Sequence, residues 1–309
     1  MSADREPTRL DRAQIRRSFE RAAATYDAAA VLQREVGARM AERLGVIRLE
    51  PTSILDAGCG TGEALGELAT RFPGAQLIGL DLALNMVRAA QRRAPPTAAG
   101  ARSLLNRLLG AGAVGAGLRP ALVCGDITRL PLGAATVDLV WSNLALQWIE
   151  APDIAFAEFR RVLNVGGLLS FTTFGPDTLR ELRAAFATVD NATHVSRFID
   201  MHDLGDMLVQ SGFADPVMDM ETLTLTYVDA EALMRELKAL GAHNASRARP
   251  RGLMGRERWR RMLAALERFR REGRLPASFE VIYGHAWKAV PRVAPDGRAI
   301  VQFTPPGSR

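Results

Sequence analysis

The sequence predicts an α/β fold built on a mainly parallel sheet. Short apolar runs recur at strand length, and segments with helical periodicity lie between them. Strands that alternate with helices in this way form βαβ units, with helices on both faces of the sheet. A glycine-rich loop directly follows the first apolar run, and this position between a strand and a helix is typical of nucleotide sites.

A helical segment precedes the first expected strand. Residues 9–45 carry apolar side chains at helical spacing, among them Ile15, Phe19 and Val36, and Pro51 ends the pattern. The elements expected after it alternate along the chain. They are strands at 53–56, 76–80, 121–124, 137–141 and 168–172, and helices at 64–71, 84–93 and 154–163.

The chain becomes mostly helical after Thr173. The expected helices are 176–189, 201–211, 229–240 and 255–272, with extended segments near 217–228 and 279–289. We expect one domain over 1–290. It comprises a cofactor-binding core at 52–173 and a helical cover with a late strand at 174–275. Residues 94–118 are expected to form a surface insertion, and residues 291–309 a flexible tail.

Composition narrows the class of protein. The chain has 309 residues, of which 48% are hydrophobic and 24% charged, as in ordinary soluble proteins. No stretch is apolar enough to span a bilayer, and the charged N-terminus is unlike a secretory signal. The cysteines, Cys59 and Cys124, have no metal-binding spacing, so we expect no metal and a reducing, cytoplasmic location.

Positive charge is concentrated in one part of the chain. Lys and Arg number 40 against 34 Asp and Glu, for a net charge of +6, and arginines crowd residues 247–274. Such a surface favours encounter with an acidic partner, although a solvated helix face has the same composition. Nucleic acid is not expected, because neither interleaved aromatic residues nor a binding motif accompanies the charge.

The glycines of the loop fall at Gly58, Gly60 and Gly62. A dinucleotide-binding fingerprint would place its third glycine at position 63, which is Glu63 here. The loop therefore departs from the pyrophosphate-binding pattern. Its spacing resembles the nucleotide loop of Rossmann-like methyltransferases, although a tight strand–helix turn alone has similar glycines.

Polar residues follow successive strands, at the sheet edge where ligands of α/β proteins bind. Asp56 suits the cationic end of S-adenosylmethionine, and Asp81, with the neighbouring Leu82, suits its ribose hydroxyls. Asp126 and Ile127 suit the adenine, and Asn143 suits the methionine moiety.

The chain resembles class I S-adenosylmethionine-dependent methyltransferases, and within them the malonyl-acyl-carrier-protein O-methyltransferases of biotin synthesis. The resemblance covers residues 12–289 and includes the blocks 18–27, 32–35, 55–62 and 141–148. It implies a seven-stranded, mainly parallel sheet with an antiparallel last strand and helical insertions over the active site. It also implies S-adenosylmethionine as cofactor and an acidic acyl carrier protein, bearing a malonyl group, as partner.

The reaction implied by this resemblance is methylation of a free carboxylate, which is ionised at pH 7 and needs no general base. Such a substrate calls for a cationic clamp, for which Arg197 is the candidate. Tyr26 is expected to close over the methionine end of the cofactor. Trp148 fits either a pocket wall or an ordinary core position.

Other functions stay open at this point. Phe174–Leu179 and residues 275–284 also resemble complex I assembly factors, which are linked to arginine methylation. That chemistry usually needs paired carboxylates, and Glu150 has no evident partner in the sequence. A small-molecule methyltransferase and a non-catalytic assembly protein are the remaining alternatives.

Overall fold

The computed structural model describes residues 10–94, 119–250, 252 and 254–289. Its centre is a seven-stranded sheet with the strand order β3-β2-β1-β4-β5-β7-β6. The strands are β1 (Ser53–Ala57), β2 (Gln76–Asp81), β3 (Ala121–Cys124), β4 (Val137–Ser142), β5 (Leu163–Phe174), β6 (Ala214–Tyr227) and β7 (Leu275–Trp287).

The pairing of the strands confirms the predicted fold class. The pairs β1–β2, β1–β4, β2–β3 and β4–β5 are all parallel. The last strand, β7, pairs antiparallel with both β5 and β6. The carboxyl ends of β1, β2, β3 and β4 therefore meet at one edge, which is where the polar residues predicted from the sequence lie.

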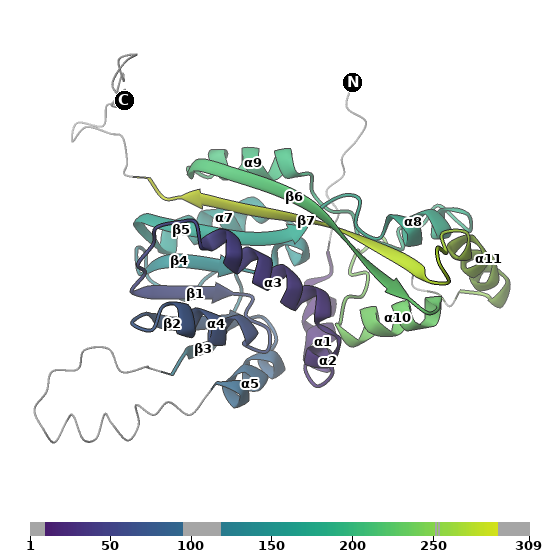
Figure 1. Ribbon diagram of the computed structural model, residues 1–309, viewed down its shortest axis with the longest axis horizontal. Coiled ribbons are helices and arrows are strands. Elements are labelled where there is room, and N and C mark those ends of the chain that lie inside the picture. The colour runs from purple at the N-terminus through teal and green to yellow at the C-terminus, as the bar shows by residue number, and fades with distance from the viewer. Residues whose placement is uncertain (1–9, 95–118, 251, 253, 290–309) are drawn as a thin grey trace, which may run out of the picture.

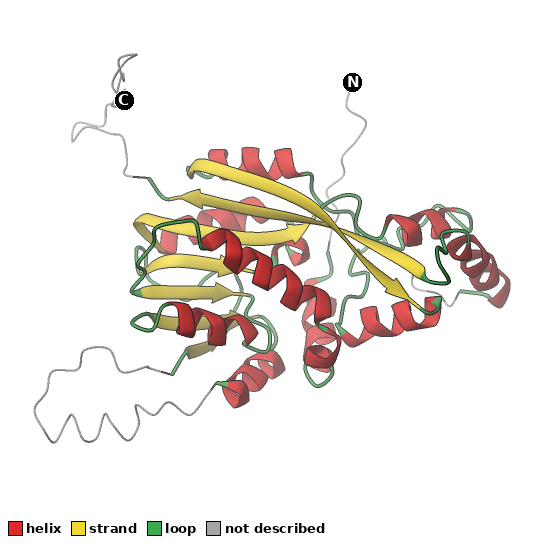
Figure 2. Cartoon of the chain, viewed as in Figure 1, coloured by secondary structure: helices red, strands yellow, loops and turns green. Residues whose placement is uncertain are grey.

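Helices cover both faces of the sheet (Figure 2). The segment expected as helix over 9–45 is divided by turns near residues 23–25 and 30. The helices, with one 3₁₀ turn η1, are α1 (Arg12–Ala22), α2 (Tyr26–Ala29), α3 (Val31–Leu44), α4 (Glu63–Arg71), α5 (Leu84–Arg93), η1 (Leu146–Trp148), α7 (Pro152–Val162), α8 (Arg180–Ala187), α9 (Met201–Gln210), α10 (Ala230–Ala239) and α11 (Arg256–Glu267).

Neighbouring residues of the central strands point to opposite faces, as the pleat of a strand requires. Ile54 belongs to the apolar cluster that includes side chains of α3 and α4. The adjacent Leu55 belongs to the cluster that includes α7 and α9. Both residues are fully buried, so β1 lies at the centre of the core and holds the loop that follows it in place.

The last two strands extend beyond the rest of the sheet. β5 pairs with β7 only as far as Phe174 and Val281, whereas β6 continues with β7 to Tyr227 and Leu275. This two-stranded extension reaches α8, α10 and α11, which form the cover with it (Figure 1). α8 is fixed to β7 by Glu181, whose buried carboxylate accepts hydrogen bonds from Ser278 N at 3.0 Å and Ser278 Oγ at 2.6 Å.

Two segments for which the sequence makes predictions lie outside the described residues. They are the insertion at 94–118, except for Ala94, and the tail at 291–309. The extent of the domain over 1–290 stays a prediction. No helix in the described part of the chain is both long and apolar enough to cross a membrane.

Candidate active site

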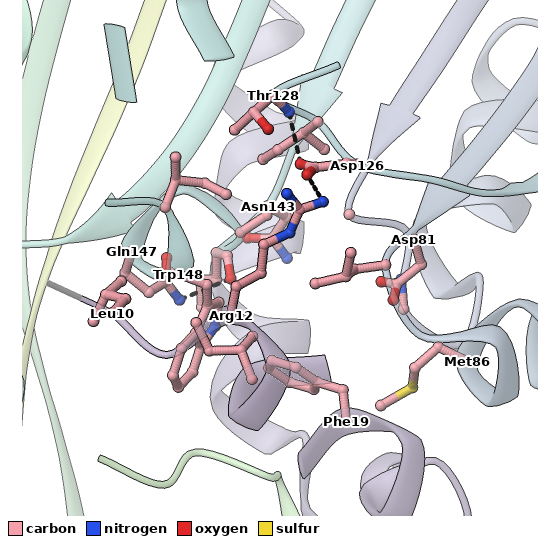
Figure 3. A pocket seen from close by; sticks show the side chains of 18 of the residues that line it. Leu10, Arg12, Phe19, Asp81, Met86, Asp126, Thr128, Asn143, Gln147 and Trp148 are labelled. Atoms are coloured by element: carbon pink, nitrogen blue, oxygen red, sulfur yellow. Dashed lines mark hydrogen bonds and ion pairs between the residues drawn. The ribbon is translucent and has the colours of Figure 1, made fainter. Parts of the chain in front are cut away.

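A cavity of about 540 Å³ opens at the carboxyl edge of the sheet (Figure 3). Its walls come from the loops after the first four strands and from α1 and α2. Eight of the residues predicted from the sequence line it: Tyr26, Gly58, Gly60, Asp81, Leu82, Asp126, Ile127 and Asn143. The structure thus brings together residues from the N-terminal segment and from four strand ends.

The glycine loop turns from β1 into α4 through backbone conformations that favour glycine. Gly58 has φ +92°, and a Cβ there would lie 2.5 Å from Ala145 Cβ. Gly62 has φ +82°, and a Cβ there would lie 2.9 Å from Ala90 Cβ on α5. Gly58 lines the cavity, whereas Gly62 is outside its lining and allows α5 to pack against the loop.

Asp81 ends β2 and holds the glycine loop. Its carboxylate accepts hydrogen bonds from Gly60 N at 3.0 Å and from Ala83 N at 2.8 Å, one on each oxygen. Burial raises the Asp81 pKa to about 6, although both backbone hydrogen bonds favour the charged form. Each oxygen retains a further acceptor position, so the pair can accept hydrogen bonds from two ribose hydroxyls.

Asp126 follows β3 and forms an ion pair with Arg12, the first residue of α1 (Figure 3). Its Oδ1 also accepts a hydrogen bond from Thr128 N at 2.8 Å. Asp126 is mostly buried, with 13% of its side chain exposed, whereas Arg12 is 63% exposed. The carboxylate expected to bind the adenine amino group is therefore paired with an arginine that the sequence did not single out.

Asn143 follows β4 and connects the sheet to α3. Its Nδ2 donates to the Gln33 carbonyl oxygen at 2.9 Å, and its Oδ1 accepts from Thr172 Oγ1 at 2.7 Å. The Gln33 side chain points into the same region, and its buried Oε1 has no hydrogen-bond partner among the described residues. An unpaired buried acceptor in a cavity wall marks a position where a ligand donor fits.

Asp56 lies beneath the cavity, and is not part of its lining. The residue is 2% exposed, and its Oδ2 has no hydrogen-bond partner among the described residues. Burial, and then the charge of Asp81, raise the Asp56 pKa to about 8. A cationic ligand group above this carboxyl would favour its charged form, so direct contact of Asp56 with the cofactor stays a prediction.

The N-terminal block holds the cofactor loops from the other side. Glu20 on α1 accepts hydrogen bonds from Leu84 N and Asn85 N, both at 2.8 Å, and so caps α5. Asp27 accepts one from Thr61 Oγ1 at 2.5 Å in the glycine loop. These contacts position Tyr26 over the loop, and burial followed by the charge of Asp81 raises the Tyr26 pKa, so its hydroxyl stays protonated.

A second cavity of about 230 Å³ adjoins the first, on the side of the cover. The two share part of their lining. The shared residues are Gln33, Gln147, Trp148, Phe174, Leu240 and Ala242. Trp148 therefore walls both cavities, and it packs edge-on against Phe19 with ring centroids 5.2 Å apart. Periodicity does not predict the second cavity, because its walls come from separate parts of the chain, among them α3, α8, α10 and the segment around 194–198.

Arg197 lies in that segment but is exposed and is not part of either lining. Its neighbours Ser196 and Phe198 do line the second cavity. Arg197 is close enough to Arg183 for its charge to lower the Arg183 pKa, after the larger effect of burial. Its role as a carboxylate clamp stays a prediction. Within the described ranges, no three His, Cys, Asp or Glu side chains gather in a way that could hold a metal ion.

The residues present fit S-adenosylmethionine. Carboxylates line the first cavity where ribose and adenine donors would lie, and Ile127 supplies an apolar contact for a ring. The unpaired acceptor Gln33 Oε1 in the wall of the first cavity suits a ligand that carries an ammonium group. Together with the strand order, this site defines a class I S-adenosylmethionine-dependent methyltransferase.

Comparison with known proteins agrees with this class and narrows it. Residues 55–171 match the family model described as a methyltransferase domain. The chain is 55% identical over 298 residues to a malonyl-acyl-carrier-protein O-methyltransferase of Laribacter hongkongensis, covering 96% of each chain. A protein of the same name from Methylovorus is 54% identical, with 97% of each chain covered. The YcgJ protein of Bacillus subtilis shares the fold, with a TM-score of 0.52, 16% identity, and coverage of 82% of this chain and 98% of that one. The chain belongs to the malonyl-acyl-carrier-protein O-methyltransferase family.

Proposed function

We propose that this protein transfers a methyl group from S-adenosylmethionine to the free carboxylate of a malonyl group on an acyl carrier protein. The single observation that supports it best is the junction of the two cavities at Gln33, Gln147 and Trp148. The first cavity carries the acids that suit the cofactor, and the second is walled mainly by apolar side chains. A donor and a thioester-linked acceptor placed in them would meet at this junction.

The chain's residues act by orientation. When bound, S-adenosylmethionine supplies an electrophilic methyl group, and its carbon–sulfur bond breaks as a carboxylate oxygen bonds to that carbon. The malonyl carboxylate is ionised at pH 7, so no residue has to remove a proton. Asp81 and the glycine loop hold the cofactor side, while Trp148 and Phe174 exclude water from the junction.

The acceptor carboxylate needs positive charge near its path. Lys238 on α10 is part of the second cavity's lining, and Arg197 lies beside two residues that line it. His243 also lines this cavity, and burial lowers its pKa, which favours the neutral form at pH 7. Lys238 and Arg197 are therefore the cations that we assign to attraction of the malonyl carboxylate, with Arg197 as the clamp.

Methylation of this carboxylate removes its charge, so the product resembles an ordinary acyl chain that fatty-acid enzymes elongate. We place the reaction early in biotin synthesis for this reason. The arginine-methylating alternative would need a pair of carboxylates around a guanidinium. Within the described residues, Glu150 lines the first cavity but has no ion pair, and nothing specific favours that chemistry.

A side-by-side methyl-transfer assay tests the proposal. The full chain and labelled S-adenosylmethionine are offered malonyl-carrier protein, malonyl-CoA and an arginine-containing protein. We expect a base-labile methyl ester on the malonyl-carrier protein, and rescue of a biotin-requiring strain by the gene. Base-stable label on arginine, with none on either malonyl thioester, would overturn the assignment.

A further inference from the structure

The outward side of α11 carries a group of arginines that the proposed chemistry does not use. We define the arginine face as Arg256, Arg260 and Arg261 on the helix, together with Arg268 at its C-cap. All four are exposed, and none has an ion-pair partner among the described residues. The acids nearby are Glu257 and Glu267, and the second of these pairs with Arg270, its Oε2 lying 2.6 Å from Arg270 Nε. The face therefore keeps a net positive charge.

The helix beneath this face is firmly packed. Met262 and Leu266 are fully buried and Ala265 nearly so, and all three belong to the same apolar cluster as Leu182 of α8 and Phe279 of β7. The arginines thus stand on a rigid support, and the exposed Trp259 adds an apolar surface among them, with 38% of the residue accessible. A rigid basic helix with one exposed aromatic side chain suits an acidic protein partner that also offers apolar contacts.

α11 is linked by a series of contacts to the wall of the second cavity, although none of its own residues lines that cavity. Arg258 of α11 forms an ion pair with Asp190, with Nη1 and Oδ2 3.9 Å apart. The other oxygen of Asp190 lies 2.8 Å from His194 Nε2. His194 lines the second cavity and stacks on Phe186, with ring centroids 4.1 Å apart. These contacts therefore join Arg258, near the start of α11, to the wall of the second cavity. Figure 1 shows α11 beside α8 at the cover end of the molecule.

We propose that the arginine face of α11 is the docking surface for the acidic carrier protein, with the second cavity taking the thioester-linked arm. This proposal rests on the proposed function. An arm attached to a carrier on α11 reaches the junction at Gln33 and Trp148 by way of the cavity behind His194. The mainly apolar lining of the second cavity suits an uncharged arm, and the positive charge of the arginine face suits the acidic carrier protein.

The test separates docking from chemistry. Arg256→Glu/Arg260→Glu reverses two charges one helical turn apart and leaves Arg258 with Asp190. Arg48→Glu/Arg92→Glu makes the same change of net charge at two exposed arginines away from the cover. Each variant is assayed with malonyl-carrier protein and with malonyl-pantetheine, which has the arm but no carrier.

We expect the α11 variant to raise KM for malonyl-carrier protein about tenfold and to leave malonyl-pantetheine turnover within about twofold. The control variant should match the unaltered protein on both substrates. The KM of the unaltered protein should rise with added salt, and that of the α11 variant should rise less. An unchanged KM for the carrier substrate, or an equal loss on both substrates, would overturn the docking surface. Absence of turnover on either malonyl substrate by the unaltered protein would instead contradict the proposed function.

Discussion

Arg12 and Asp126 form an ion pair across the mouth of the first cavity, where Asp126 is expected to bind the adenine amino group. The pair joins the start of α1 to the loop after β3. Each oxygen of Asp126 retains a further acceptor position, but the guanidinium of Arg12 occupies space beside the carboxylate and neutralises its charge, so a bound cofactor competes with the arginine. Entry of the cofactor is thereby linked to the position of the N-terminal helix.

Arg12→Ala is expected to tighten cofactor binding. The pair is largely exposed on the arginine side, so its loss changes the free energy by no more than about 1 kcal/mol, equivalent to about fivefold in affinity. Titration calorimetry with S-adenosylmethionine measures the change. Arg17→Ala, on the exposed side of the same helix, is the control. Weaker binding by the Arg12 variant would show that the guanidinium contacts the cofactor instead.

Asp81→Asn is expected to weaken cofactor binding by about tenfold to a hundredfold, since hydrogen bonds to a charged group contribute about 1.5–3 kcal/mol. The amide also loses an acceptor for Gly60 N or Ala83 N, which loosens the glycine loop. The same calorimetric titration gives the affinity, with the exposed Asp153→Asn as control. An unaltered dissociation constant would remove Asp81 from the ribose site.

Asp56 should make the cofactor-free protein less stable as pH rises. Its folded-state pKa of about 8 lies above the ordinary value of 3.8, so between these values the folded protein holds a proton that the unfolded chain releases. The free energy of unfolding then falls as pH increases through this window. Tm should decrease from about pH 5 to about pH 8, and Asp56→Asn should flatten the decrease. The exposed Asp206→Asn should keep the full slope, and a full slope in the Asp56 variant would refute the assignment.

Gln33→Leu should weaken cofactor binding. Its Oε1 is a buried acceptor in the wall of the first cavity with no partner among the described residues, and it suits the ammonium group of the cofactor. We expect the dissociation constant for S-adenosylmethionine to rise about tenfold, since a hydrogen bond to a charged group contributes about 1.5–3 kcal/mol. Tm of the cofactor-free protein should rise slightly, because the unpaired Oε1 is removed. Gln91→Leu on α5 is the exposed control, and an unchanged dissociation constant in the Gln33 variant would contradict this placement.

Arg197→Ala should lower turnover on malonyl thioesters about tenfold or more, since a lost charge-assisted hydrogen bond is worth about 1.5–3 kcal/mol. Cofactor affinity should not change, because Arg197 is not part of the first cavity's lining. Steady-state kinetics and calorimetry on one preparation check both statements. Arg235→Ala removes an exposed arginine that pairs with Glu231 on α10 and serves as the control. Full activity of the Arg197 variant would leave Lys238 as the cation for the acceptor.

The parts of the site that follow strand ends could be predicted from the sequence. A strand can be recognised from a few consecutive residues, and the carboxyl ends of parallel strands lie at the same edge of a sheet. The sequence therefore predicts that Asp81, Asp126 and Asn143 lie close together, and all three line the first cavity. The parallel part of the fold followed from the alternation of strands and helices, whereas the antiparallel last strand was implied by the family resemblance alone.

Contacts between distant segments could not be predicted in this way. Arg12 meets Asp126, and Glu20 caps α5, only because the 9–45 segment breaks into three helices and turns back over the sheet edge. Helical periodicity is nearly the same on both sides of such a break. The second cavity was missed for a related reason, since its walls come from many separate stretches of chain with no common pattern.

The link between Glu181 and Ser278 has a consequence for how the protein reaches its native state. These residues are 97 positions apart, and the two hydrogen bonds to the buried Glu181 carboxylate both come from Ser278, beside an ion pair with the adjacent Arg180 at 3.4 Å. α8 thus gains these hydrogen bonds to the sheet only after β7, which follows it by about 90 residues, has entered the sheet. Pairings of such long sequence separation form slowly. We expect the nucleotide half to acquire protection from hydrogen exchange first, and the acceptor cover to follow as a later kinetic phase.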